Sequence, residues 1–191
     1  MLISPQGFLG WYMVKSGLGD QAAAALDGVP RVSQYRLASH LGSAFILYSL
    51  FLWQGFNHLL TPKPLPDVKS ISRLRGLAHG IMTAVFVTAL SGAFVAGLDA
   101  GLTYNSYPKM ADRWVPSDLV SEHISPKWKN IFENPTTVQF NHRHLAESTV
   151  VFISGFWLLA RKAPLHPRAR LAVNCLLGMA LTQVGHTHTH T

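Results

Sequence analysis

The sequence predicts an all-α fold, a polytopic bundle of transmembrane helices, and three observations point to it. Of the 191 residues, 48% are hydrophobic and only 13% are charged, whereas roughly 25% of the residues in soluble domains are charged. The apolar residues are gathered into long runs. The basic residues lie mainly in the segments between these runs. Together these features predict three complete membrane spans and two partial helices.

Three runs are long enough to cross a bilayer, for which about 18 to 20 residues suffice. Leu37–Leu60 and Gly76–Leu98 contain 24 and 23 residues without Asp, Glu, Lys or Arg. Gln139–Ala160 contains 22 residues, with two charged residues near its start. Pro135 precedes this third run and marks the beginning of its helix, because proline is favoured in the first turn.

Two shorter apolar runs, Met1–Val14 and Leu171–Gly185, lie at the chain ends. With 14 and 15 residues, each would cover about 21 to 23 Å of a hydrocarbon core about 30 Å thick. We therefore expect both helices to be partial. The following segment 185–191, GHTHTHT, is a low-complexity His/Thr tail; such a tract binds metal adventitiously, and we expect no physiological site there.

The formal net charge of +7 would suit a nucleic-acid partner, but the basic residues form no groove-reading patch. They concentrate in Thr61–Arg75 and Arg161–Arg170, which lie on one side of the membrane if all three long runs span it. On the other side, Lys15–Arg36 and Asp99–Val138 balance seven basic residues with seven acidic ones. Basic residues in short loops mark the cytoplasmic or matrix side. The charge therefore predicts topology and no nucleic-acid partner.

Two histidines lie just inside the same predicted membrane face, because His40 and His142 both follow a charge-balanced loop. A histidine within a membrane is costly unless it pairs, lines a cavity or binds a metal. Both are therefore candidate ligands; the alternative is an imidazole that reaches the headgroup layer. His142 and His144 point in roughly opposite directions on one helix, so only one of them can be a ligand. We expect His144 and Glu147 to belong to a structural cluster with Arg143.

The segment Asp99–Val138 is longer than the roughly 12 to 15 residues of an ordinary connection. Its aromatic and proline content, in TYNSYPKM and RWVPSDL, indicates an ordered cap on the membrane surface. The alternative is a mobile loop.

Three segments, QYRLASHLGSA, AGLDAGLTYNSYPKMADRWVPSDL and NPTTVQFNHRHLA, closely resemble the heme A synthase family of the mitochondrial type, which is needed for cytochrome c oxidase assembly. The resemblance extends from about Gln6 to Val184. It implies eight transmembrane helices in two four-helix halves, each holding a haem between histidines on its second and fourth helices. By this resemblance His40 is the fourth-helix ligand of the first half, and His142 is the second-helix ligand of the second half.

The same resemblance implies a domain organisation. Residues 1–60 would end the first half, 61–75 would form a matrix linker, and 76–184 would begin the second half, with the intermembrane-space loop 99–138 and the tail 185–191. Helices carrying the other ligand of each haem would precede Met1 and follow Val184. The resemblance thus implies a form truncated at both ends, and we expect the 191-residue chain alone to make no haem A.

The implied reaction is oxidation of a methyl group of haem O to the formyl group of haem A, with a haem b that delivers electrons from a ferredoxin. The resemblance places the chain in the mitochondrial inner membrane, downstream of a haem O synthase, and allows a homo-oligomer. Arg143 would pair with a haem propionate, and Tyr104, Asn105 and Trp114 would cover the site; catalytic residues are not identified. Two alternatives stay open: a non-catalytic haem-binding membrane subunit, and a helical membrane protein without a cofactor.

Overall fold

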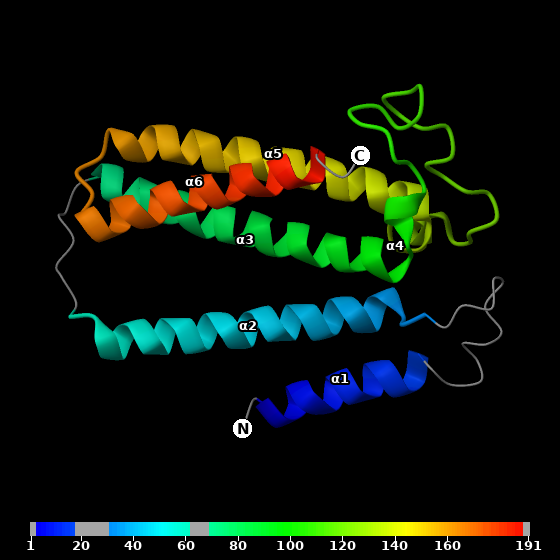
Figure 1. Cartoon of the computed structure of the whole chain (residues 1–191), viewed down its shortest axis with the longest axis horizontal. Coiled ribbons are helices and arrows are strands. Elements are labelled where there is room, and N and C mark those ends of the chain that lie inside the picture. Colours follow the sequence, from blue (N-terminus) through cyan, green and yellow to red (C-terminus); the bar gives the residue numbers. More distant parts are fainter. Residues whose placement is uncertain (1–2, 18–30, 62–68, 189–191) are drawn as a thin grey trace. The chain divides into compact units, whose positions relative to one another are not determined.

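All named elements in the described part of the chain are helices. The computed structural model describes residues 3–17, 31–61 and 69–188, with side chains up to 184. The long helices are α1 (Ile3–Gly17), α2 (Gln34–Leu59), α3 (Lys69–Gly97), α5 (Pro135–Arg161) and α6 (Pro167–His188). Between α3 and α5 lie η1 (Ala100–Leu102), η2 (Lys127–Lys129) and α4 (Asn130–Glu133) (Figure 1). The all-α prediction is confirmed for these residues.

Some helices extend beyond the apolar runs that predicted them. α3 begins at Lys69, so the end of the predicted linker 61–75 is helical. α6 contains 22 residues and at 1.5 Å per residue measures about 33 Å, which is longer than the predicted partial helix. Charged and polar residues are tolerated at the ends of membrane helices, so a count of apolar residues underestimates the helix. α1, with 15 residues, is short as expected, and the end of the tail, 189–191, lies outside the described residues.

The surface of the helices is strongly apolar. No large side chain is fully buried among the described residues, while α2 exposes more than half of Phe51, Trp53 and Phe56. A soluble protein would bury such residues. α3 is the one described helix that is both long and apolar enough to cross a membrane. The chain therefore fits a membrane protein, while the three predicted spans stay a prediction.

The chain divides into two compact units, which are described separately. Unit 1 contains residues 1–62 and 89–142, and unit 2 contains residues 63–88 and 143–191. Each unit includes part of α3 and part of α5. These units follow the local packing of the helices and do not test the predicted halves 1–60 and 76–184.

In unit 2, residues of α3, α5 and α6 pack around an apolar cluster. Its buried members are Leu74, Ile81, Ile153, Phe156, Ala160 and Ala163, and Leu165, Val173, Leu176, Leu177 and Ala180 pack against them. The two alanines are small enough to let the chain after α5 fold back closely. The hydroxyl oxygens of Thr88 on α3 and Thr149 on α5 lie 2.9 Å apart, which adds a polar contact between these helices.

In unit 1, the start of α2 packs on the end of α3. The ring of Tyr35 lies edge-on to Phe94 with centroids 5.5 Å apart, and Phe132 lies close to both rings. Beside them, Arg31 Nε is 2.8 Å from Asp99 Oδ2. These contacts place the segment before α2 and the loop after α3 at the same end of unit 1, in agreement with the charge pattern; residues 18–30 of the first loop lie outside the described residues.

The contact between α2 and α3 depends on a glycine. A Cβ added at Gly97 would lie 2.6 Å from the Cα of Gln34, so a side chain there must push the backbones apart. A Cβ at Gly80, on the same helix, would meet nothing within 4 Å.

We expect Gly97→Ala to destabilise the chain by about 1 to 3 kcal/mol through overpacking. Gly80→Ala is the matched control and should stabilise it by about 0.5 to 1 kcal/mol, because alanine is the better helix former. Thermal unfolding in detergent, followed by circular dichroism, measures both. A Gly97→Ala chain at least as stable as the Gly80→Ala chain would contradict the close approach.

Candidate functional site

His142 is held against α3 at one edge of its ring. It lies on α5 seven residues after Pro135 and is half-buried. Its Nδ1 is 2.7 Å from the hydroxyl oxygen of Ser91. A Cβ added at the neighbouring Gly92 would lie 3.2 Å from His142 Cε1, so the glycine lets the ring approach the helix. Because Ser91 engages Nδ1, a metal at this imidazole would be bound through Nε2.

His40 is held against α1 in a similar way. The side-chain nitrogen of Gln6 lies 3.1 Å from His40 Nδ1 and donates to the His40 carbonyl at 3.0 Å. The Ser43 hydroxyl donates to the Gln6 side-chain oxygen at 2.6 Å. A Cβ at Gly10 would lie 2.9 Å from His40 Cε1. We call this arrangement, a polar group at Nδ1 and a glycine at Cε1 on the neighbouring helix, a histidine clasp.

The two clasps favour the imidazole proton on different ring nitrogens. The Ser91 hydroxyl can accept a hydrogen bond from Nδ1–H of His142, which leaves the Nε2 lone pair for a metal. The Gln6 amide nitrogen instead donates to His40 Nδ1, which requires the proton on Nε2. Binding of iron to His40 therefore requires the Gln6 amide to turn over, so that its oxygen accepts Nδ1–H.

The donor set suits haem iron better than a free metal ion. The described residues contain no group of three or more His, Cys, Asp or Glu that could hold a metal ion. Haem iron is held in its porphyrin and takes only one or two axial ligands from protein. Metal-binding histidines almost always donate their other ring N–H to an acceptor; His142 can donate to Ser91, and His40 can donate to Gln6 once the amide has turned over. His40 and His142 thus fit a haem.

The residues near His142 on α5 differ in their exposure. His142 and Arg143 are half-buried, whereas His144 and Glu147 are exposed. This agrees with the prediction that His142 and His144 point in different directions. The proposed pairing of Arg143 with a haem propionate stays a prediction.

The long loop is ordered and is bound to the start of α5. The Asn134 side-chain oxygen accepts the backbone N–H of Thr136 at 3.0 Å, which caps the helix. Its side-chain nitrogen donates to the carbonyls of Asp118 and Leu119 at 2.9 and 3.1 Å. The Thr137 hydroxyl also donates to the Leu119 carbonyl. The ordered cap is therefore supported over the mobile loop.

Asp118 joins the loop to α5 through its carboxylate. Tyr104 donates to one oxygen at 2.8 Å and Thr136 to the other at 2.6 Å. Burial by itself would raise the pKa of Asp118, but these hydrogen bonds outweigh it and hold the pKa below the ordinary value of 3.8. The ionised carboxylate is the form that this network stabilises.

The loop reaches α5 one turn before His142. The Gln139 side-chain nitrogen donates to the Tyr104 carbonyl at 2.8 Å, and residues three apart share a helix face. The Gln139 side-chain oxygen is buried without a hydrogen-bond partner among the described residues. This oxygen is therefore an unused hydrogen-bond acceptor near the face of α5 that carries His142. Of the predicted covering residues, Tyr104 belongs to this contact, whereas Asn105 and Trp114 are exposed.

Sequence reasoning missed the clasp residues Gln6, Ser91, Gly10 and Gly92. The available signal was a polar residue beside or one turn from a glycine, on a largely apolar helix. Small residues permit close helix contacts and polar ones bond across them in membrane proteins.

These features define an all-helical protein of the membrane type that presents a clasped histidine from each of two helix pairs. A family model described as "Cytochrome oxidase assembly protein", COX15-CtaA, matches residues 1–186, and the chain belongs to this family. No solved structure matches the chain.

Curated relatives carry the name heme A synthase. "Heme A synthase COX15" of Homo sapiens is 53% identical over 184 residues, which cover 96% of this chain and 44% of the human protein. "Heme A synthase" of Nitrosospira multiformis is 42% identical over 182 residues, covering 94% of this chain and 48% of that protein. The chain spans less than half the length of these relatives. The predicted membership of the family is confirmed.

We expect Asp118→Asn to loosen the loop, because the neutral amide is a weaker acceptor for Tyr104 and Thr136. Amide hydrogen exchange across residues 104–119, corrected for intrinsic rates, should become severalfold faster. Asp112→Asn, at an exposed position of the same loop, is the control and should change little.

The lowered pKa also predicts a pH dependence. The contribution of Asp118 to stability is fully present above 3.8, its ordinary pKa, and is lost as the pH falls through the lower pKa of the folded state. Wild-type exchange should therefore approach that of Asp118→Asn in strong acid. Equal exchange by both chains at neutral pH would contradict the network.

Proposed function

We propose that this chain contributes the residues of a haem A synthase, in which a methyl group of haem O is oxidised to the formyl group of haem A. The observation that carries the proposal is the pair of clasped histidines: Ser91 can accept Nδ1–H of His142, as a metal-binding imidazole requires, and Gln6 can do so for His40 once its amide has turned over. The 53% identity with a human protein named heme A synthase supports the substrate.

In this proposal His40 and His142 would hold the iron of two haems, a haem b and the haem that is substrate or product. The bound haem supplies electron transfer and oxidation, while the protein binds it, orients it and excludes water. Ser91 accepts Nδ1–H of His142, which raises the basicity of Nε2 and fixes the plane of the ring. Gly92 keeps the ring close to α3. At His40, Gly10 lets the ring lie close to α1, and Gln6 would accept Nδ1–H only after its amide has turned over.

Arg143 and the long loop have two further roles in this proposal, at the haem propionates and above the site. Arg143 would pair with a haem propionate, because a planar guanidinium can bind a carboxylate through two hydrogen bonds. The loop with Tyr104, Asn105 and Trp114 excludes water above the site. Its attachment to α5 through Gln139 supports this assignment.

The proposal includes the mitochondrial inner membrane as location, with three complete spans. The basic segments 61–75 and 161–170 then face the matrix, and the loop 99–138 faces the intermembrane space. A ferredoxin supplies electrons and a haem O synthase supplies the substrate, and the proposal allows a homo-oligomer. The charge asymmetry of the segments supports the orientation.

The experiment replaces the matching segment of the human relative with this chain and expresses the chimera in cells without the native enzyme. We expect haem A to form. His142→Ala should remove most haem from the second half and abolish haem A formation, whereas the matched control His144→Ala should be mild. The 191-residue chain alone should make no haem A, because each family site needs two histidines and this chain contributes one.

Three other results of this experiment would contradict parts of the proposal. Loss of haem in His144→Ala but not in His142→Ala would overturn the assigned helix face. A chimera that shows a Soret band and makes no haem A would favour the non-catalytic haem-binding subunit. A chimera without a Soret band would favour a cofactor-free membrane protein.

A further inference from the structure

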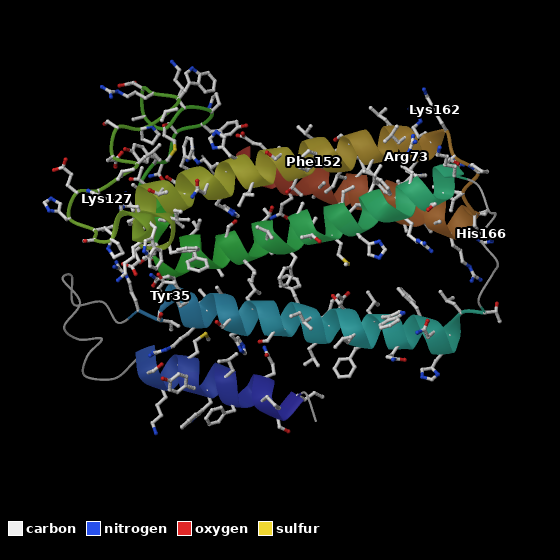
Figure 2. The ribbon with its side chains drawn as sticks, turned by 180° about the vertical axis from the view of Figure 1, so that it is seen from behind. Tyr35, Arg73, Lys127, Phe152, Lys162 and His166 are labelled. Carbon is white, nitrogen blue, oxygen red and sulfur yellow. The ribbon has the colours of Figure 1, made fainter. Side chains whose placement is uncertain are left out.

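Two grooves flank the C-terminal end of α5 in unit 2. The larger, with a volume of about 260 Å³, is lined by Trp157, Arg161, Arg170, Asn174 and apolar side chains of α5, α6 and the segment between them. The smaller, of about 140 Å³, is lined by Ser70, Arg73, Lys162 and apolar side chains of α3, α5 and the segment just after α5. Figure 2 shows Arg73, Lys162 and His166 at this end of the unit. Both grooves combine positive charge with an apolar wall.

The positive charge at this end is not balanced by the described residues of unit 2. Their basic side chains are Lys69, Arg73, Arg75, Arg143, Arg161, Lys162, Arg168 and Arg170, and their single carboxylate belongs to Glu147. Glu147 lies about 21 Å from Arg161 along α5 at 1.5 Å per residue, too far for an ion pair. The charge therefore favours an anionic ligand.

The larger groove holds its two arginines in fixed positions. The Arg161 guanidinium lies 4.7 Å from the centroid of the Trp157 ring, and the ring is fixed by a 2.9 Å hydrogen bond from its Nε1 to Asn174 Oδ1. Arg170 donates to the Ala163 carbonyl at 3.1 Å. A guanidinium stacked on an aromatic face keeps its N–H groups in the plane, where they can bind a phosphate through two hydrogen bonds.

We propose that the larger groove binds the phosphate headgroup of an anionic phospholipid, with Arg161 and Arg170 on the phosphate and an acyl chain along the apolar wall. A free phosphate would use the arginines and leave the groove-facing apolar atoms of Leu165 and Val173, which are only partly buried, in contact with water. Trp and Arg at a helix end are typical of the membrane interface, and basic pockets between helices bind anionic lipid headgroups. The proposal is independent of haem.

The test measures lipid binding by the 191-residue chain in a neutral detergent, by native mass spectrometry. Phosphatidylglycerol should bind, whereas phosphatidylcholine, and glycerol 3-phosphate at the same concentration, should bind far more weakly. Arg161→Gln and Arg170→Gln should each weaken phosphatidylglycerol binding about fivefold, the usual effect of one basic residue at an anionic lipid surface.

Arg168→Gln is the matched control, because it removes the same charge from the first turn of α6 but lines neither groove. It should weaken binding less than twofold. Arg161→Lys keeps the charge and loses the planar stacking, so binding should also weaken; this variant keeps the test decisive if a glutamine variant does not fold.

Three results would overturn the proposal. Equal loss in Arg168→Gln and Arg161→Gln would show diffuse attraction to the basic segment. Equal binding of glycerol 3-phosphate and phosphatidylglycerol would show a site for free phosphate. Equal binding of phosphatidylcholine would show an apolar groove in which the arginines have no role.

Discussion

Each candidate ligand depends on a hydrogen bond that reaches its Nδ1 from a neighbouring helix. An imidazole placed in an apolar environment loses its hydrogen bonds to water, so it needs a partner within the protein. Ser91 provides this partner to His142, and Gln6 provides it to His40. The helices must then approach closely enough for the contact, which explains the glycine at each ring. The clasps thus connect helix packing directly to the nitrogen that a metal would use.

The loop after α3 also helps to position the candidate ligand His142, because it holds the start of α5. Asn134 and Asp118 bind the loop to the first turn of α5. His142 lies about 10 Å further along this helix at 1.5 Å per residue, and His40 lies at a similar depth in α2. A fixed helix start therefore fixes the depth of the ligand, and the loop that does so also reaches Gln139, one turn from His142.

Sequence reasoning predicted the helices and selected the two histidines as candidates, because both depend on local patterns. Runs without charged residues predict helices, and a histidine within such a run stands out. The partners of the histidines are different, since Gln6 and Ser91 lie 34 and 51 residues away in sequence. Periodicity reports which face of a helix is apolar and does not report which residue of another helix meets that face. The same limit applies to Asp118, whose role depends on Tyr104 and Thr136 from separate segments.

The helix ends were the least predictable elements for a related reason. Lys69 and Pro167 begin α3 and α6 outside the apolar runs, because a helix end can place polar side chains in water while its backbone bonds continue. Arg161 and Arg170 belong to this category. The charge of these two arginines indicates only an orientation in the membrane. Their positions beside Trp157 and the groove are what indicate a ligand.

The most direct test of the clasp is the reduction potential of haem bound to the chain in a His40→Ala background, where His142 is the remaining ligand. Ser91→Ala removes the acceptor at Nδ1, lowers the basicity of the imidazole and should shift the potential in the positive direction. Thr88→Ala removes a hydroxyl that is bonded to Thr149 on the same helix pair, and it should leave the potential unchanged. Equal shifts in both variants, or no shift in Ser91→Ala, would contradict the account.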